Sequence, residues 1–254
     1  MLKIVVTFAL PQEFGAWRRI ARFEPLKGRG GPIYLMRTAN AEVYAVMLGI
    51  GMRSVPSELR DLLANSADLC IASGLAGSLK KQYHPRAILV AKAVRTGGPD
   101  RAIESDKSLV ETAKRLGAAT VDFFLTSSAV LNSPAEKMRF GQIADAVDME
   151  SFHVLSRAAE NGIPSVAVRA ISDGAETNLP FDLNRIIDGR GQIRWSAALN
   201  EVVKSPLRVP QWIRFGVESA GAARNLAHFL DGYTQSLIAA PRPERELVGG
   251  VERK

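Results

Sequence analysis

The sequence predicts an α/β fold, with a mostly parallel or mixed sheet and helices on both faces. Apolar, β-branched runs alternate along the chain with segments of helical periodicity. The clearest unit is a helix that stops at Asn161-Gly162, followed by the apolar strand 165–171. That strand is apolar along most of its length, which is typical of a strand covered on both faces.

The other elements follow from the same periodicities and from turn residues. Pro11 opens a helix after the first strand, since proline suits a first helical turn, and Ser105 is the expected cap of another. Strands are expected at 2–9, 33–37, 42–48, 68–73, 86–94, 120–126, 143–147 and 165–171. Helices are expected at 11–20, 54–64, 105–116, 134–140, from the turn containing Glu150 to Asn161, and at 183–188, 194–203 and 210–233.

Length and composition fit a single large domain, which we place at residues 1–240, followed by a flexible tail at 241–254. No apolar run approaches the roughly 20 residues that span a bilayer, and the first apolar stretch is interpreted as a strand and not a signal peptide. Cys70, the only cysteine, lies in an apolar run and is expected to be a buried structural thiol. The three histidines have no ligand spacing, so no metal site is predicted. The composition indicates a cytoplasmic protein.

The formal net charge is +7, from 33 basic and 26 acidic residues. Most basic residues are interleaved with acids, and no alternation of basic and aromatic residues indicates stacking on bases. We therefore expect a solvated basic surface and no nucleic-acid partner. Contact with a membrane surface is left as an open alternative.

Three carboxylates occupy positions of consequence. Glu13 stands in the first helical turn after a strand, Glu150 in the first turn of another helix, and Asp173 just past a strand end, where open α/β sheets bind ligands. A solvated helix-start acid or a turn acid is the plain alternative for each. The glycines Gly49 and Gly51 follow a strand and precede a helix, so their N–H groups could cradle an anion or merely form a tight turn.

These residues lie in motifs that resemble a known family. AVDMES (146–151) and VRAISDGA (168–175) are similar to the paired signature of the purine nucleoside phosphorylase and methylthioadenosine/adenosylhomocysteine nucleosidase superfamily. ALPQEF (9–14), LGIG (48–51) and SGLAGSL (73–79) match its first loop and its two glycine turns in order. The resemblance covers residues 1 to about 180. The later part, with LPFDL (179–183), looks more like the hopanoid-associated branch.

The resemblance implies a three-layer, nucleoside-phosphorylase-like fold in which helices flank a central mixed, twisted sheet. It also implies a homodimer or higher homo-oligomer, and a purine nucleoside substrate with water or phosphate as co-substrate and no cofactor. Asp173 would protonate purine N7 as a general acid kept protonated by burial, and Glu13 would activate water. The remaining implied roles are ribose binding by Met149 and Glu150, base binding by Ala76, Gly77, Val130, Leu131 and Ser172, and a nucleophile or anion site at Gly49, Gly51 and Gly74.

The departures from the family bear on the reaction. Phosphorylases carry an arginine and a hydroxyl residue where this chain has Ala72 and Leu75, neither of which binds phosphate through its side chain. This favours hydrolysis, although Arg53 or Arg18 could supply a charge from elsewhere. Ser128 replaces an acid of the nucleosidases, and the segment 94–120 lacks their aromatic lid, so the base and the 5′ substituent are left open.

The resulting hypothesis is cleavage of the N-glycosidic bond of a purine nucleoside, by hydrolysis of a 5′-modified adenosine with release of adenine. Phosphorolysis of a nucleoside, including a lipid-linked adenosine, and a non-catalytic nucleoside-binding protein are the alternatives. Apolar residues interleaved with arginines at 194–229 predict a bulky, apolar 5′ side, or simply helices packed on the sheet.

Overall fold

The computed structural model describes residues 1–26, 32–52, 55–98, 102–180, 182–188, 191, 194, 200 and 208–240. The expected tail at 241–254 and nearly all of the expected helix at 194–203 lie outside these residues. The same holds for Arg53 and for most of the loop at 27–32.

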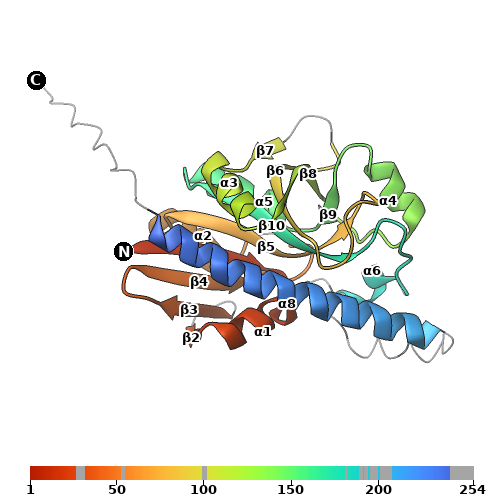
Figure 1. The fold of residues 1–254 in the computed structure, drawn as a ribbon, viewed down its shortest axis with the longest axis horizontal. Helices are drawn as coiled ribbons and strands as arrows, with labels where there is room; N and C mark the ends of the chain where they lie inside the picture. The colour runs from red at the N-terminus through yellow and green to blue at the C-terminus, as the bar shows by residue number, and fades with distance from the viewer. Residues whose placement is uncertain are drawn as a thin grey trace, which may run out of the picture.

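The described chain alternates strands with helices, as the periodicities predict (Figure 1). The strands are β1 (Leu2–Phe8), β2 (Glu24–Leu26), β3 (Ile33–Arg37), β4 (Ala41–Met47), β5 (Leu69–Ser78), β6 (Ile88–Arg95), β7 (Ala102–Glu104), β8 (Ala119–Thr126), β9 (Ala146–Asp148) and β10 (Ser165–Asp173). The helices are α1 (Pro11–Ile20), α2 (Ser57–Asn65), α3 (Lys107–Arg115), α4 (Pro134–Phe140), α5 (Ser151–Glu160), α6 (Leu183–Ile186) and α8 (Val209–Ala239).

The strands form one mixed ten-stranded sheet in the order β10-β6-β8-β9-β5-β1-β4-β3-β2, with β7 paired to β6. Strand β5 also pairs with β10 in parallel, so β10, β6, β8, β9 and β5 close into a ring. Strand β1 lies between β5 and β4, parallel to both. The ring brings the ends of β5, β9 and β10 together, and these strands carry most of the predicted site residues.

Helices cover both faces of this sheet, which gives the expected mixed α/β architecture (Figure 1). Successive residues of a strand point to opposite faces. In β1, Ile4, Val6 and Phe8 accordingly face α1, α3 and α8, whereas Val5 faces α2 and α5. Both faces are apolar because both are buried.

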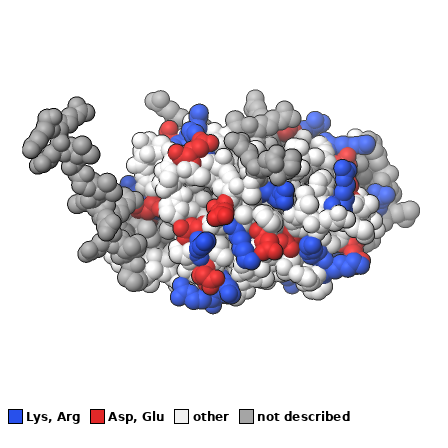
Figure 2. Space-filling view, turned by 90° about the horizontal axis from the view of Figure 1, so that it is seen from above, with Lys and Arg blue, Asp and Glu red and all other residues white. Residues whose placement is uncertain are grey.

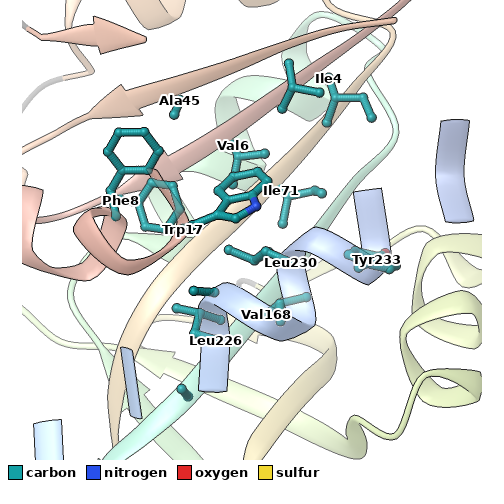
Figure 3. Packing of buried hydrophobic residues seen from close by; sticks show 14 of the residues in the cluster. Ile4, Val6, Phe8, Trp17, Ala45, Ile71, Val168, Leu226, Leu230 and Tyr233 are labelled. Atoms are coloured by element: carbon teal, nitrogen blue, oxygen red, sulfur yellow. The ribbon is translucent and has the colours of Figure 1, made fainter. Parts of the chain in front are cut away.

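Aromatic side chains fill the contact between β1, α1 and α8 (Figure 3). Trp17 is fully buried, with its ring centroid 6.1 Å from that of Phe8 and 4.8 Å from that of Phe23. Leu226, Leu230 and Tyr233 of α8 close the same cluster. Packing of α1 onto α8 fixes the first helical turn, where Glu13 lies.

Several predicted boundaries need correction. The segment Gly74–Ser78, expected to be a turn, continues β5 because β10 and β9 pair with it on either side. Asp106 rather than Ser105 caps α3, since its side chain accepts hydrogen bonds from the N–H groups of Ser108 and Leu109. Asp173 ends β10 instead of following it, and Glu150 is the N-cap of α5.

Charged side chains are spread over the surface in both signs. Figure 2 shows lysines and arginines interspersed with aspartates and glutamates on the face it presents. Within the described ranges, no helix is both long and apolar enough to cross a membrane. Cys70 is buried as expected, and burial raises the pKa of its thiol to about 12.

The buried tryptophan supports a stability prediction. Trp17→Ala should lower the free energy of unfolding by about 3–5 kcal/mol, because it removes a large side chain from a packed core. Ile20→Ala on the same helix is the matched control: Ile20 is 42% exposed, and its truncation should cost under about 1 kcal/mol. Urea denaturation of both variants measures the difference. Equal losses would contradict the packing described.

Candidate active site

The predicted site residues surround one cavity of about 580 Å³ at the ends of β5, β9 and β10. Three of its walls come from segments far apart in the sequence: the turn into α1, the end of β5 and the end of β10. The predicted residues that line it are Glu13, Ala76, Gly77, Val130, Leu131, Met149, Glu150, Ser172 and Asp173. We call Glu13, Asp148 and Glu150 the acidic wall of this cavity. Gly49, Gly51 and Gly74 do not line the cavity, but Gly51 lies beside Met149 and Gly74 beside Glu13.

Asp173 is held by a buried lysine that the sequence analysis did not identify. Lys137, on α4, is 1% exposed and donates hydrogen bonds to Asp173 Oδ2, to the Gly174 carbonyl at 2.8 Å and to the Thr177 carbonyl at 3.3 Å. Ser172 Oγ donates to Asp173 Oδ1 at 2.6 Å. Both carboxylate oxygens of Asp173 therefore accept hydrogen bonds from neighbouring side chains. The expected role of Asp173 as a general acid stays a prediction, now with Lys137 and Ser172 as its hydrogen-bond partners.

A second buried cation, Arg169 on β10, lies among three carboxylates. Its Nε is 3.1 Å from Asp148 Oδ2, and its Nη2 is 3.5 Å from Glu150 Oε2. Its Nε and Nη2 also donate to Ser151 Oγ at 3.2 and 2.9 Å. Burial lowers the pKa of Arg169, but Asp148, Glu150 and Glu13 together raise it above its ordinary value. The guanidinium thus remains charged in the interior.

Gly74 leaves the space in which this guanidinium meets Glu13. A Cβ at position 74 would lie 2.5 Å from Arg169 Nη1 and 3.1 Å from either carboxylate oxygen of Glu13. The φ of Gly74 is +140°, which residues with side chains rarely adopt. Both constraints require glycine here, so Gly74 supports the acidic wall without touching the ligand space.

Glu13 has three backbone partners. Its Oε2 accepts hydrogen bonds from the N–H groups of Ala9 and Leu10 at 2.9 and 3.0 Å, and its Oε1 accepts one from Leu75 at 2.9 Å. Burial raises the pKa of Glu13 above its ordinary value, while Arg169 and these hydrogen bonds lower it in part. The carboxylate is therefore fixed in orientation and more basic than a solvated glutamate.

Glu150 faces the same cavity from the start of α5. Its Oε1 accepts a hydrogen bond from the Gly51 N–H at 2.9 Å. Burial raises the pKa of Glu150 to about 7, because Arg169 and the Gly51 bond offset only part of the effect and the nearby Asp148 and Glu13 raise it further. The single charge of Arg169 is thus shared among three carboxylates, and Glu150 can take up a proton near neutral pH.

The glycine turn at 49–51 does not present free donors to an anion. The Gly49 N–H donates to the Ala9 carbonyl at 3.0 Å, the Ile50 N–H to the Gly191 carbonyl at 2.9 Å, and the Gly51 N–H to Glu150. A Cβ at Gly51 would lie 2.9 Å from Met149 Cε, so this glycine also lets Met149 reach the cavity. The turn positions Glu150 and Met149 and does not form an open anion cradle.

The far side of the cavity is apolar. It is formed by Leu179, by Leu183 and Ile187 at α6, and by Phe215, Gly216, Ala220 and Ala223 of α8, with Ser219 as a polar residue among them. Ile213 and Val217 on the same helix are exposed instead, at 63% and 52%. Several of the apolar residues on which the prediction of an apolar 5′ side is based lie outside the described chain: Trp195, Leu199, Val202, Val203 and Leu207.

Sequence reasoning missed three functional side chains: Lys137, Asp148 and Arg169. Asp148 and Arg169 lie inside the two signature segments and follow a simple pattern, a charged residue within an apolar strand. Nothing in the sequence around Lys137 distinguishes it from a solvated helical lysine. Arg18, considered as an anion ligand, instead lies 4.5 Å from the ring centroid of Tyr34 and does not line the cavity.

Comparison with known proteins places this site in a family. A model of the phosphorylase superfamily matches residues 3–204, so the chain belongs to the phosphorylase superfamily. A comparison with curated protein sequences gives no match.

Solved structures of similar fold include two enzymes of Helicobacter pylori. The 5′-methylthioadenosine/S-adenosylhomocysteine nucleosidase with butyl-thio-DADMe-Immucillin-A has a TM-score of 0.72 at 20% identity, over 93% of this chain and 99% of that one. A futalosine hydrolase mutant has a TM-score of 0.69 at 19% identity, over 93% and 100%. The Campylobacter jejuni nucleosidase has 0.71 at 16%, also over 93% and 100%. At these identities the likeness shows the fold alone.

The buried Lys137–Asp173 pair generates a prediction. Lys137→Met should lower the free energy of unfolding by about 3–5 kcal/mol, because it leaves Asp173 as an uncompensated buried charge. Lys81→Met is the matched control. It breaks the exposed Lys81–Glu176 pair and should leave stability unchanged, since exposed pairs contribute little. Chemical denaturation at pH 7 compares them, and a Lys137 variant as stable as the control would refute the buried pair.

Proposed function

We propose that this protein hydrolyses the N-glycosidic bond of a purine nucleoside, with a 5′-modified adenosine as the best-fitting substrate. The observation that carries the proposal is the convergence of Glu13, Glu150 and Asp173 on one cavity. The three acids come from three different elements, and each has its own hydrogen-bond or ion-pair partners. Binding of a nucleoside alone would not require three buried acids. The names of structurally similar proteins, two of them nucleosidases and one a hydrolase, point the same way.

The acidic wall suits a reaction that generates positive charge on a sugar. In the proposed complex the Glu150 carboxylate accepts hydrogen bonds from the 2′- and 3′-hydroxyls, and Met149 packs against the ribose. Glu13 takes a proton from the attacking water, and its negative charge stabilises the cation-like sugar in the transition state. The three backbone N–H groups on Glu13 fix its direction, so it need not reorganise during the reaction.

The departing base needs a proton on N7, and the Lys137–Asp173 pair would supply it. Asp173 accepts hydrogen bonds at both oxygens, so it can pass on a proton only after receiving one. The Lys137 ammonium is the proton donor in contact with Asp173 Oδ2. In the proposed step Lys137 passes a proton to Asp173 Oδ2, and Asp173 passes a proton to N7 as the C1′–N9 bonding electrons leave with the base. Lys137 is then neutral, and Asp173 is back in its starting state.

Water fits this site better than phosphate as the nucleophile. Lys137 is the only cation among the described residues lining the cavity, and Asp173 already neutralises it. Arg169 is 1% exposed behind the acidic wall. Ala72 is fully buried, and Leu75 offers no polar side chain. A phosphate dianion placed beside Glu13 and Glu150 would meet like charge, and the described residues that line the cavity offer no free cation to offset it.

A second candidate rests on the apolar wall formed by α6 and α8. These residues could hold a long or bulky 5′ substituent, as on a lipid-linked adenosine. Phosphorolysis of such a substrate is the alternative reaction. The apolar wall suits a bulky substituent but does not discriminate between water and phosphate as the nucleophile. The two reactions are therefore distinguished by the sugar product, a free sugar or a sugar 1-phosphate.

Incubation of the purified protein with a panel of nucleosides tests both candidates. The panel contains adenosine, 5′-methylthioadenosine, an adenosine with a long 5′-alkyl chain and inosine, each with and without phosphate. We expect release of free adenine and a free sugar at a rate that phosphate does not change. Accumulation of a ribose 1-phosphate would overturn hydrolysis. Nucleoside binding without release of base would overturn catalysis altogether.

Glu13→Gln should abolish hydrolysis while leaving the binding of a substrate analogue within about threefold, because a general base acts mainly in the transition state. Glutamine keeps an acceptor for the Leu75 N–H but turns an amide group toward the N–H groups of Ala9 and Leu10. Thermal melting of the variant must therefore accompany isothermal titration. A folded variant that turns over at the wild-type rate would exclude Glu13 as the base.

The acid limb of kcat/KM should lie near pH 7, well above that of an ordinary glutamate. Glu150 must be ionised to accept hydrogen bonds from ribose, and its pKa is raised to about 7. Glu13 must be ionised to accept a proton from water, and its pKa is raised in the same direction. Activity should therefore fall at least about tenfold per pH unit as the pH decreases below 7, and more steeply once both carboxyls are protonated. A profile from pH 4 to 9 that stays flat down to pH 5 would contradict both assignments.

A further inference from the structure

The loop beside the base end of the cavity is fixed by a side chain of α6. The Val130 N–H donates to Asn184 Oδ1 at 2.8 Å, and Asn184 Nδ2 donates to the Val130 carbonyl at 3.1 Å. A single side-chain amide thus pairs with both main-chain polar groups of one residue. The arrangement mimics the way a neighbouring strand pairs with an extended residue.

Two further residues hold Asn184 in place, and we call Asn132, Asp182 and Asn184 the amide clamp. Asp182 Oδ1 accepts hydrogen bonds from Asn132 Nδ2 at 2.9 Å and from Asn184 Nδ2 at 3.1 Å. It also accepts one from the Asn184 N–H at 3.1 Å, as the N-cap of α6. Asn132 Nδ2 donates to the Val130 carbonyl at 3.3 Å, and its Oδ1 accepts from the Leu183 N–H at 3.3 Å. The clamp therefore joins the loop to α6 at several points.

This pairing leaves the adjacent residue, Leu131, for the ligand. Both polar groups of Val130 face Asn184, so they point to the same side, as they do in an extended residue. In extended chain the N–H and C=O of the next residue point to the opposite side. Leu131 is 8% exposed and lines the cavity, and its N–H and C=O have no partner among the described residues. An unpartnered donor and acceptor at a buried residue require a ligand or water.

We infer that Asn184 is a positioning residue that turns the Leu131 main-chain edge toward the base and thereby sets base selectivity. The inference rests on the proposed function. An N–H and a C=O on one residue complement a base edge with an acceptor beside a donor, as on a 6-aminopurine. A 6-oxopurine presents an acceptor at position 6 and a donor at position 1, so it would meet both groups with the wrong polarity.

The clamp also narrows the predicted base contacts. The Val130 N–H and C=O are engaged with Asn184, so Val130 can contact a base through its side chain only, and hydrogen bonding falls to Leu131. Leu183, which precedes Asn184, and Ile187, at the end of α6, line the apolar wall of the same cavity. One short segment therefore supports the base loop and contributes to the 5′ side.

The test compares Asn184→Ala with Arg185→Ala, its neighbour on α6. Arg185 is exposed, and its ion pair is with Asp182 Oδ2, whereas the clamp uses Asp182 Oδ1. Arg185→Ala therefore leaves the Asn184–Val130 hydrogen bonds in place and is the matched control. The ratio of kcat/KM for adenosine to that for inosine should fall about five- to tenfold in Asn184→Ala, because a loosened edge loses its hydrogen bonds to adenine. Arg185→Ala should keep the wild-type ratio. A merely structural role for Asn184 would lower both rates equally and leave the ratio unchanged.

Hydrogen exchange at the Val130 amide gives a readout that does not need catalysis. Asn184→Ala should speed this exchange at least tenfold. Asn184→Asp keeps the acceptor for the Val130 N–H but removes the donor to the Val130 carbonyl. It should leave the exchange slow while still lowering the adenosine-to-inosine ratio of kcat/KM, which we call the base ratio. If the wild type cleaves no nucleoside, the proposed function fails, and equilibrium binding of free adenine against hypoxanthine then replaces the rates. Unchanged exchange in Asn184→Ala, or an unchanged base ratio in both variants, overturns the inference.

Discussion

The site depends on one buried guanidinium. Arg169 lies on a strand whose nine residues are all buried, and it contacts Asp148 at 3.1 Å and Glu150 at 3.5 Å while Glu13 approaches across Gly74. Without this cation, three carboxylates would share an interior that cannot solvate them. With it, they remain close together but not fully neutralised. Burial raises the pKa values of Glu13 and Glu150, and Arg169 offsets this effect only in part.

The fold supplies what this arrangement requires. The β5–β10 pairing brings Gly74 and Arg169 opposite each other, so the strand register alone places the missing Cβ beside the guanidinium. The same strand pair continues to Gly77 and Asp173, where Lys137 provides the second buried cation. Each acid that the reaction is proposed to use thus has a main-chain or cationic partner: Leu75 for Glu13, Arg169 for Glu150 and Lys137 for Asp173. The two halves of the proposed reaction, at the sugar and at the base, share one rigid frame.

Local periodicity and motifs in the sequence predicted several helix bounds and the main acidic residues of the site. The bounds of α1 and α4 match the predictions, because a proline opens each helix and each carries helical spacing. The motifs also predicted that Glu13, Glu150 and Asp173 would meet. The extension of β5 through Gly74–Ser78 could not be predicted, since its pairing partners β9 and β10 lie far along the chain. Nor could the burial of Lys137, because a lysine on a short helix is normally solvated.

The central claim is that a single arginine leaves the carboxylates of this cavity short of positive charge. A titration of 13C-labelled glutamate side chains by NMR measures this directly, with Glu13→Gln and Glu150→Gln used for assignment. The account predicts that the Glu150 carboxyl titrates near pH 7 and that of Glu13 above its ordinary value. Titration of both at the pH of solvent-exposed glutamates would contradict the account, because the carboxylates would then be fully compensated or not buried together.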